Sequence, residues 1–93
     1  MQPPAAPGID VFFALEDGAQ RSEVARIVAD LRRAGVSAES DHAGRSLKGQ
    51  LTQAGRLGAA RTVVVTAEKA ILRAPGAADE QVLLGELVGR LVP

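Results

Sequence analysis

Two short and almost entirely apolar runs constrain the fold of this chain more than any other feature. Residues 10–15 read DVFFAL, and residues 62–66 read TVVVT. Short runs rich in β-branched or aromatic side chains are typical of strands buried on both faces, as in parallel sheets that helices cover. We therefore expect an α/β domain in which residues 62–66 form a central strand.

Three further segments have the apolar spacing of amphipathic helices. The first is predicted over about 19–34, with Asp17 and Gln20 as a loose capping box and Gly35 as its stop. The second is predicted to begin at Ser46, a natural N-cap, and to end at Gly58. The apolar faces of these two helices and of a closing third helix are Val24, Ile27, Val28 and Leu31; Leu47, Leu51, Ala54 and Leu57; and Leu83, Leu84, Leu87, Val88 and Leu91.

The remaining strands are shorter and less apolar. Residues 36–40 alternate between apolar and polar side chains, which predicts a half-exposed strand at a sheet edge. Residues 70–73 are a candidate strand, and PGAADE at 75–80 is expected to be a loop. The order β-α-β-α-β, then a short strand or two, then α predicts a three-layer α/β/α domain with a mixed, largely parallel sheet of about five strands. Right-handed crossovers place the second strand outside the first and the third on the other side of the first.

Composition excludes several classes of function. The 93 residues hold 11 basic and 11 acidic side chains, so the whole molecule has no strong field and sequence-blind binding to DNA or a membrane is not expected. With no cysteine and one histidine, a disulfide, a thiol nucleophile and a multi-histidine or cysteine zinc site are excluded.

The proline-rich start is not a signal peptide and is expected to be a linker over 1–8, ahead of one domain over 9–93. The lack of cysteine fits a cytoplasmic protein.

Local charge differs from the total around the second helix. Residues 41–61 hold four cations and one acid, so an anion site is expected to be confined to this segment. Arg45 and Lys48 lie at the helix start, where backbone N–H groups favour anions. Structure alone also accounts for them, because Arg45 is placed to pair with Asp41 or Glu39, and Lys48 and Arg56 suit a solvated helix face.

Other sites find no support in the sequence. Glu16 and Asp17 follow the first strand as a phospho-receiver's metal-binding acids do, but no carboxylate ends the third strand. The two glycine-rich nucleotide-binding patterns, G-x-G-x-x-G and G-x-x-x-x-G-K-[ST], are both absent after the first strand. His42 has Asp41 and Ser46 nearby in sequence, but a hydrolytic triad needs a geometry that sequence adjacency does not supply.

The stretch DHAGRSLKGQLTQAGRLGAARTVVV over 41–65 resembles one known family. It is similar to the C-terminal anticodon-binding domain of histidyl-tRNA synthetase, a class II aminoacyl-tRNA synthetase, and the resemblance covers about residues 9–66 well. The matching positions are Gly44, Arg45, Ser46, Leu47, Lys48, Gln50, Leu51, Ala54, Leu57, Gly58 and Ala59. The chain departs from the family at His42, where tyrosine is usual, at Gly49, where a second lysine is common, and in a shorter segment after Thr66.

The resemblance implies binding of the anticodon loop of tRNA-His, so that a catalytic domain elsewhere in a parent chain can charge the distant acceptor end. The class II catalytic motifs are absent, so this chain alone is not expected to be an enzyme, and ATP and Mg would belong to the parent enzyme. The resemblance also implies a possible homodimer. The candidate RNA-binding residues are Arg45, Lys48, Ser46, His42, Glu16, Asp17, Gln53 and Arg56.

Two alternatives belong to other classes. The chain is also consistent with a free-standing regulatory or protein-interaction domain of the synthetase fold that docks a partner or dimerises. A third hypothesis is that the chain binds a small ligand at the carboxyl ends of the strands, but no sequence motif supports it.

Overall fold

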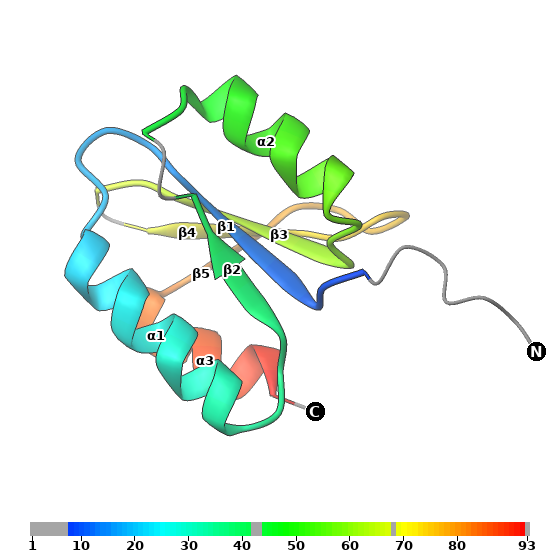
Figure 1. Ribbon diagram of the computed structural model, residues 1–93. Coiled ribbons are helices and arrows are strands. Elements are labelled where there is room, and N and C mark those ends of the chain that lie inside the picture. The colour runs from blue at the N-terminus through cyan, green and yellow to red at the C-terminus, as the bar shows by residue number, and fades with distance from the viewer. Residues whose placement is uncertain (1–7, 42–43, 68, 93) are drawn as a thin grey trace, which may run out of the picture.

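The computed structural model describes residues 8–41, 44–67 and 69–92. In chain order the elements are β1 (Val11–Leu15), α1 (Arg21–Arg33), β2 (Ala38–Ser40), α2 (Leu47–Arg56), β3 (Arg61–Val65), β4 (Ala70–Arg73), β5 (Glu80–Val82), a 3₁₀ turn (Leu84–Glu86) and α3 (Leu87–Leu91), as Figure 1 shows. In this described part of the chain, no helix has the length and apolar character needed to cross a membrane.

The strands form one mixed sheet in the order β2-β1-β3-β4-β5. β1 pairs in parallel with β2 on one side and with β3 on the other, which confirms the predicted placement of the first three strands. β4 and β5 add antiparallel pairings, so the parallel part of the sheet is confined to β2, β1 and β3. The connection from β3 to β4 is too short for a crossover between parallel strands. These two strands can therefore pair only in the antiparallel direction.

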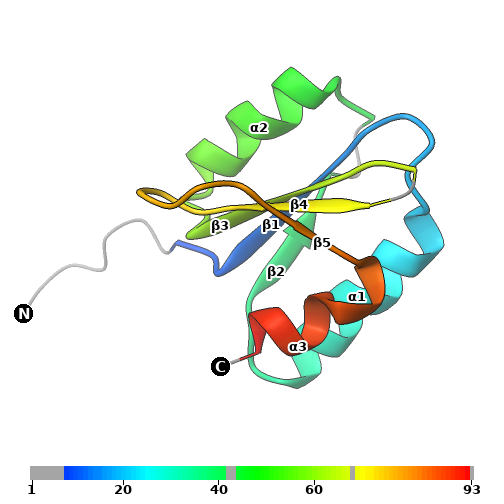
Figure 2. The same cartoon turned by 180° about the vertical axis from the view of Figure 1, so that it is seen from behind.

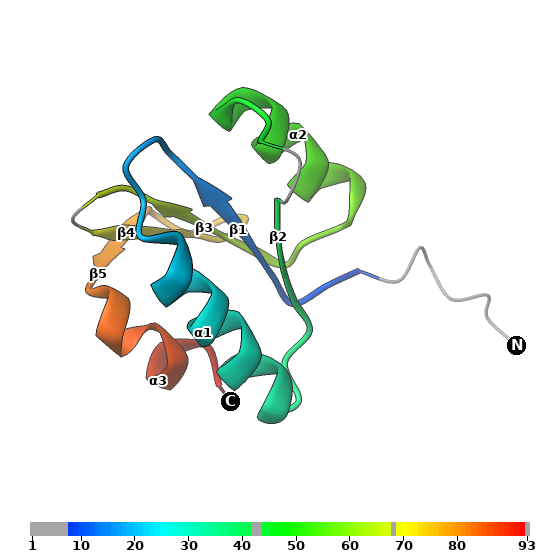
Figure 3. The same ribbon diagram turned by 60° about the vertical axis from the view of Figure 1, so that its left-hand side comes forward.

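Helices cover both faces of this sheet, as the predicted three layers require. α2 lies on one face, and α1 and α3 lie side by side on the other (Figures 2 and 3). All five residues of β1 are buried, because alternate side chains enter the two cores. Phe12 and Ala14 pack beneath α2, whereas Val11, Phe13 and Leu15 pack against the layer of α1 and α3.

Three local expectations differ from the structure. α1 begins after Gln20 with no side-chain cap, so the capping box from Asp17 is wrong; Asp17 lies in the preceding turn. The predicted 75–80 loop ends one residue earlier, because Glu80 already belongs to β5. Leu83 does not join the apolar face of the closing helix: its backbone is extended between β5 and the 3₁₀ turn, and the residue is 63% exposed.

Candidate functional site

Five candidate residues lie where β1 and β2 end and α2 begins: Glu16, Asp17, Arg45, Ser46 and Lys48. Parallel strands end at the same edge of a sheet, so the loop after β1, which carries Glu16 and Asp17, lies beside the start of α2 (Figure 1). Asp41 directly follows β2 at that edge. His42, the predicted stacking residue, lies outside the described residues.

Ser46 caps α2, as the sequence predicts. Its backbone is extended, with φ −60° and ψ 163°, and its Oγ accepts a hydrogen bond from the Gly49 N–H at 3.2 Å. Gly44, two residues before Ser46, has φ +71°, a conformation that suits glycine and turns the chain toward the helix. The helix start is therefore fixed by local sequence.

Arg45 is paired with Asp41 rather than with Glu39. Its guanidinium bonds to Asp41 Oδ1, and its backbone N–H donates to Asp41 Oδ2 at 3.0 Å. Glu39 lies instead 3.3 Å from the guanidinium of Arg32. The Asp41 side chain is 2% exposed and that of Arg45 is 46% exposed, so the guanidinium is held on one side and open to solvent on the other.

Gln50 is a buried polar residue that sequence reasoning noted only as part of a motif. Its Oε1 accepts from the Leu15 N–H at 2.7 Å, while its Nε2 donates to the Leu15 carbonyl at 2.8 Å and to the Arg45 carbonyl at 2.9 Å. These bonds tie the first turns of α2 to the end of β1. The available signal was its position on the apolar side of the helix, between Leu47 and Leu51, where a lone amide must find buried partners.

The outward face of α2 is basic. An open hollow of about 400 Å³ lies along it, and its lining contains no acidic side chain. Lys48 and Arg56 are exposed, and neither forms an ion pair with any residue that the structure describes. The lining residues are Arg45, Ser46, Lys48, Gly49, Thr52, Gln53 and Arg56. The structure thus brings together five of the eight candidate residues around one hollow, formed by α2 and the two residues before it.

Glu16 and Asp17 lie at the same edge of the sheet but belong to a separate loop. The Glu16 N–H donates to the Val65 carbonyl at 2.9 Å, which continues the pairing of β1 with β3; Glu16 is half-buried and Asp17 exposed. Across residues 8–41, 44–67 and 69–92, no group of three or more His, Cys, Asp or Glu side chains is arranged to hold a metal ion.

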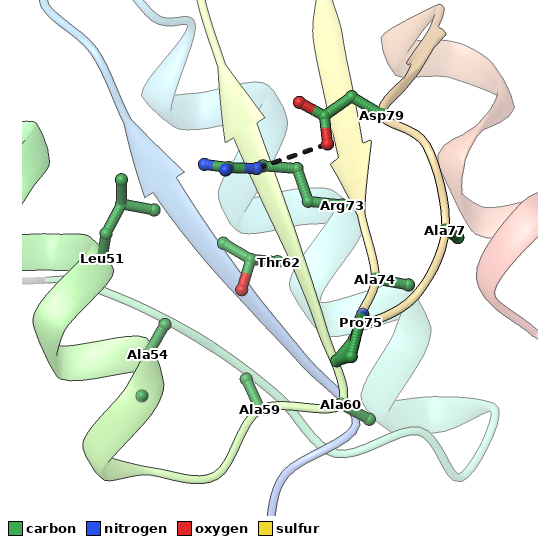
Figure 4. A pocket seen from close by; sticks show the side chains of 11 residues that line it. Leu51, Ala54, Ala59, Ala60, Thr62, Arg73, Ala74, Pro75, Ala77 and Asp79 are labelled. Atoms are coloured by element: carbon green, nitrogen blue, oxygen red, sulfur yellow. Dashed lines mark ion pairs between the residues drawn. The ribbon is translucent and has the colours of Figure 1, made fainter.

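A second hollow of about 540 Å³ lies on the other flank of α2, against β3 and β4 (Figure 4). Its floor and walls are mostly small side chains, such as Ala54, Ala59 and Pro75. Arg73 reaches over it, with its Nε 3.5 Å from Asp79 Oδ1, so the cation there is matched by an acid. Sequence reasoning named neither residue, because their proximity depends on the β4–β5 connection.

The chain is similar in sequence and in fold to histidine–tRNA ligases. No protein-family model matches the chain. The chain is 34% identical over 95 residues to the histidine–tRNA ligase of Geobacillus thermodenitrificans, an alignment that covers 96% of this chain and 22% of that protein. The chain therefore spans about a fifth of the length of this curated relative.

Solved structures give the same picture. The whole chain aligns with 25% of the histidyl-tRNA synthetase of S. aureus, with a TM-score of 0.83 and 27% identity. It also aligns over 91% of its length with 24% of the RNA binding domain of threonyl-tRNA synthetase from Cryptosporidium parvum, with a TM-score of 0.68. Because identity to the second is 16%, that likeness shows the fold alone.

Proposed function

Because the chain belongs by sequence and by fold to the anticodon-binding domain family of histidyl-tRNA synthetases, we propose that it binds the anticodon arm of tRNA-His. The observation that carries the proposal is the outward face of α2, where Arg45, Lys48 and Arg56 share one open hollow with no acid. In a chain with no net charge, this concentration of cations is the surface most suited to a polyanion.

Phosphates of the RNA are proposed to lie along α2. Lys48 and Arg56 are exposed cations on this face, and the positive end of the helix dipole, in the first turn, adds to the attraction of Lys48 for an anion. Such contacts set affinity and register but carry no sequence information. We therefore expect them to respond strongly to salt and weakly to the anticodon sequence.

Base recognition is proposed for the residues around the start of α2. The solvent-facing side of the Arg45 guanidinium can bond to a phosphate or to a guanine edge. Gln53, half-buried on α2, and the carboxylates of Glu16 and Asp17 can bond to base edges and amino groups. His42 is proposed to stack on a splayed base, as single-stranded RNA recognition usually requires.

In this role the domain positions tRNA-His for aminoacylation by a catalytic domain elsewhere in a longer cytoplasmic enzyme. Residues 9–93 would be the RNA-binding part and residues 1–8 a linker to that domain. ATP and Mg would serve the catalytic domain, and dimerisation would be a property of the whole enzyme. Affinity of this chain alone is expected to be low, because its contact surface is a single helix face and two loops.

A binding assay with two RNAs tests the proposal. Fluorescence anisotropy is measured with a labelled tRNA-His anticodon stem-loop carrying GUG and with the same stem carrying a scrambled loop, each at low and at moderate salt. We expect salt-sensitive binding of both, tighter for GUG. Equal affinity for the two loops would contradict anticodon recognition, and no binding at low salt would leave the free-standing docking or dimerisation domain as the better account.

A further inference from the structure

The described part of the chain buries two polar or charged side chains, and both bond to the same residue. They belong to Asp41 and Gln50, which as whole residues are 6% and 2% exposed. Asp41 bonds to the Arg45 backbone N–H and guanidinium, and Gln50 bonds to the Arg45 carbonyl. Arg45 is therefore held at its N–H, its carbonyl and its charged head.

Asp41 fixes the direction of the Arg45 side chain. A buried carboxylate is costly unless it is paired and hydrogen-bonded, so the geometry in which it accepts both bonds from Arg45 is strongly favoured. The guanidinium is consequently held against Asp41, while the Arg45 side chain as a whole is 46% exposed and lines the hollow on α2. A free arginine on this loop would sample many rotamers instead.

Gln50 fixes the loop relative to the sheet. Its amide bonds to both backbone groups of Leu15, the last residue of β1, and to the carbonyl of Arg45. One side chain thus connects β1, the loop before α2 and α2 itself. Because its amide group is satisfied on both its oxygen and its nitrogen, a small shift of the loop would leave a buried polar group unpaired.

We propose that Asp41 and Gln50 are positioning residues that preorganise Arg45 for RNA. The inference deepens the proposed function and rests on it for the RNA step. A side chain that is ordered before binding loses less conformational entropy on binding. Asp41 and Gln50, which together form a clamp on Arg45, therefore raise affinity without touching the RNA.

For the change in RNA affinity caused by Asp41→Asn, this role and simple electrostatics predict opposite signs. Asp41→Asn removes a negative charge beside the site, so charge alone predicts tighter binding of RNA. Positioning predicts weaker binding, because the asparagine amide has a single accepting oxygen and cannot accept from both the Arg45 backbone N–H and the guanidinium. We expect Asp41→Asn to weaken binding of the anticodon stem-loop about 3- to 10-fold.

Two controls separate positioning from other causes. Asp30→Asn makes the same charge change on α1, where Asp30 pairs with Arg33 on the surface, and is expected to leave affinity unchanged or slightly raised. In an Arg45→Gln background, Asp41→Asn is expected to cause no further loss, since the residue it positions is gone. Affinity equal to or tighter than wild type for Asp41→Asn, or the same loss in both backgrounds, would overturn the proposal.

A measurement on the RNA-free protein keeps the inference separate from the proposed function. The Arg45 guanidinium nitrogens, observed by NMR, should show slowed rotation in the wild type and fast rotation in Asp41→Asn. Gln50→Glu, with Gln81→Glu on the exposed part of β5 as control, should release Arg45 in the same way, because a carboxylate cannot donate to the Leu15 and Arg45 carbonyls. Slowed rotation with no RNA binding would refute the proposed function and keep the clamp, whereas fast rotation in the wild type would refute the clamp itself.

Discussion

At the level of single residues, the cations on α2 differ in what holds them. Arg45 is bound to a buried carboxylate, whereas Lys48 and Arg56 extend into solvent without an ion-pair partner among the described residues. A guanidinium held by a carboxylate suits recognition of a particular group, whereas a solvated cation suits a phosphate at variable position. The two kinds of cation should therefore respond differently to substitution.

Lys48→Gln is expected to weaken binding of the GUG and scrambled stem-loops by the same factor. The proposed contact of the lysine is a phosphate rather than a base, so its loss should also reduce the slope of log affinity against log salt by about 0.7. Anisotropy titrations at several salt concentrations measure both quantities. Arg26→Gln, on α1, removes a cation away from α2 and should change neither; loss of discrimination between the loops in Lys48→Gln would assign Lys48 a base instead.

Ser46 allows capping to be separated from RNA contact. Ser46→Ala should lower the free energy of unfolding by about 1 kcal/mol, because the Gly49 N–H loses its acceptor. Ser46→Asp should keep the cap and the stability but weaken RNA binding through its negative charge. Thermal unfolding and anisotropy on the two variants test this, and tight RNA binding by Ser46→Asp would remove the helix start from the site.

Residue-scale sequence reasoning succeeded where partners are local. The Ser46 cap was predictable because its acceptor and donor lie three residues apart. The Asp41–Arg45 pair was one of two alternatives, since Glu39 is also near Arg45 in sequence. The Gln50–Leu15 contact was not predictable, because those residues are 35 positions apart and meet only once α2 packs on β1.

At the level of elements, burial decided which strands the sequence could identify. β1 and β3 are packed on both faces, so their apolar runs are unmistakable. β5 has one buried residue, Val82, and two exposed polar ones, so its sequence resembles a loop. Its strand character comes from pairing with β4, which no local pattern encodes.

Two glycines near the end of α2 should respond oppositely to alanine. Gly55 lies inside the helix with open space around its Cβ position, so Gly55→Ala should stabilise the protein by about 0.5–1 kcal/mol. Gly58 has φ +67°, and a Cβ added there would lie 3.3 Å from the Gly8 Cα, so Gly58→Ala should destabilise the protein by about 1–2 kcal/mol. Chemical unfolding measures both, and equal effects would contradict the stop assigned to Gly58.

β5 and α3 are joined by an ion pair that should make stability depend on pH. The Arg90 guanidinium donates to Glu80 Oε1 at 2.6 Å, and this hydrogen bond lowers the pKa of Glu80 below its ordinary 4.5. Because the folded-state pKa is the lower one, the stabilisation is present above pH 4.5 and lost as pH falls through the lowered value. NMR titration of the Glu80 carboxyl should give a pKa that returns toward 4.5 in Arg90→Gln; an unchanged value would show that the pair does not form in solution.

At the level of the whole molecule, the order of the first three strands followed from the handedness of crossovers alone. That order brings the ends of β1 and β2 to one edge, and α2 packs on β1, so the loop that carries Glu16 comes near Arg45 although the two residues lie far apart in sequence. The balanced total charge was also informative, because it confined any anion site to one segment. Which side chains face that site depended on packing and could not be read from composition.

The central claim is that the anticodon arm of tRNA-His lies on the outward face of α2 and the loop after β1. The most direct measurement is an NMR titration of the ¹⁵N-labelled domain with the GUG stem-loop, beside one with the scrambled loop. We predict that amide shifts are confined to residues 41–56 and 16–20 and are larger for GUG. Shifts centred elsewhere on the domain, equal shifts for both loops, or none at millimolar RNA would contradict the claim.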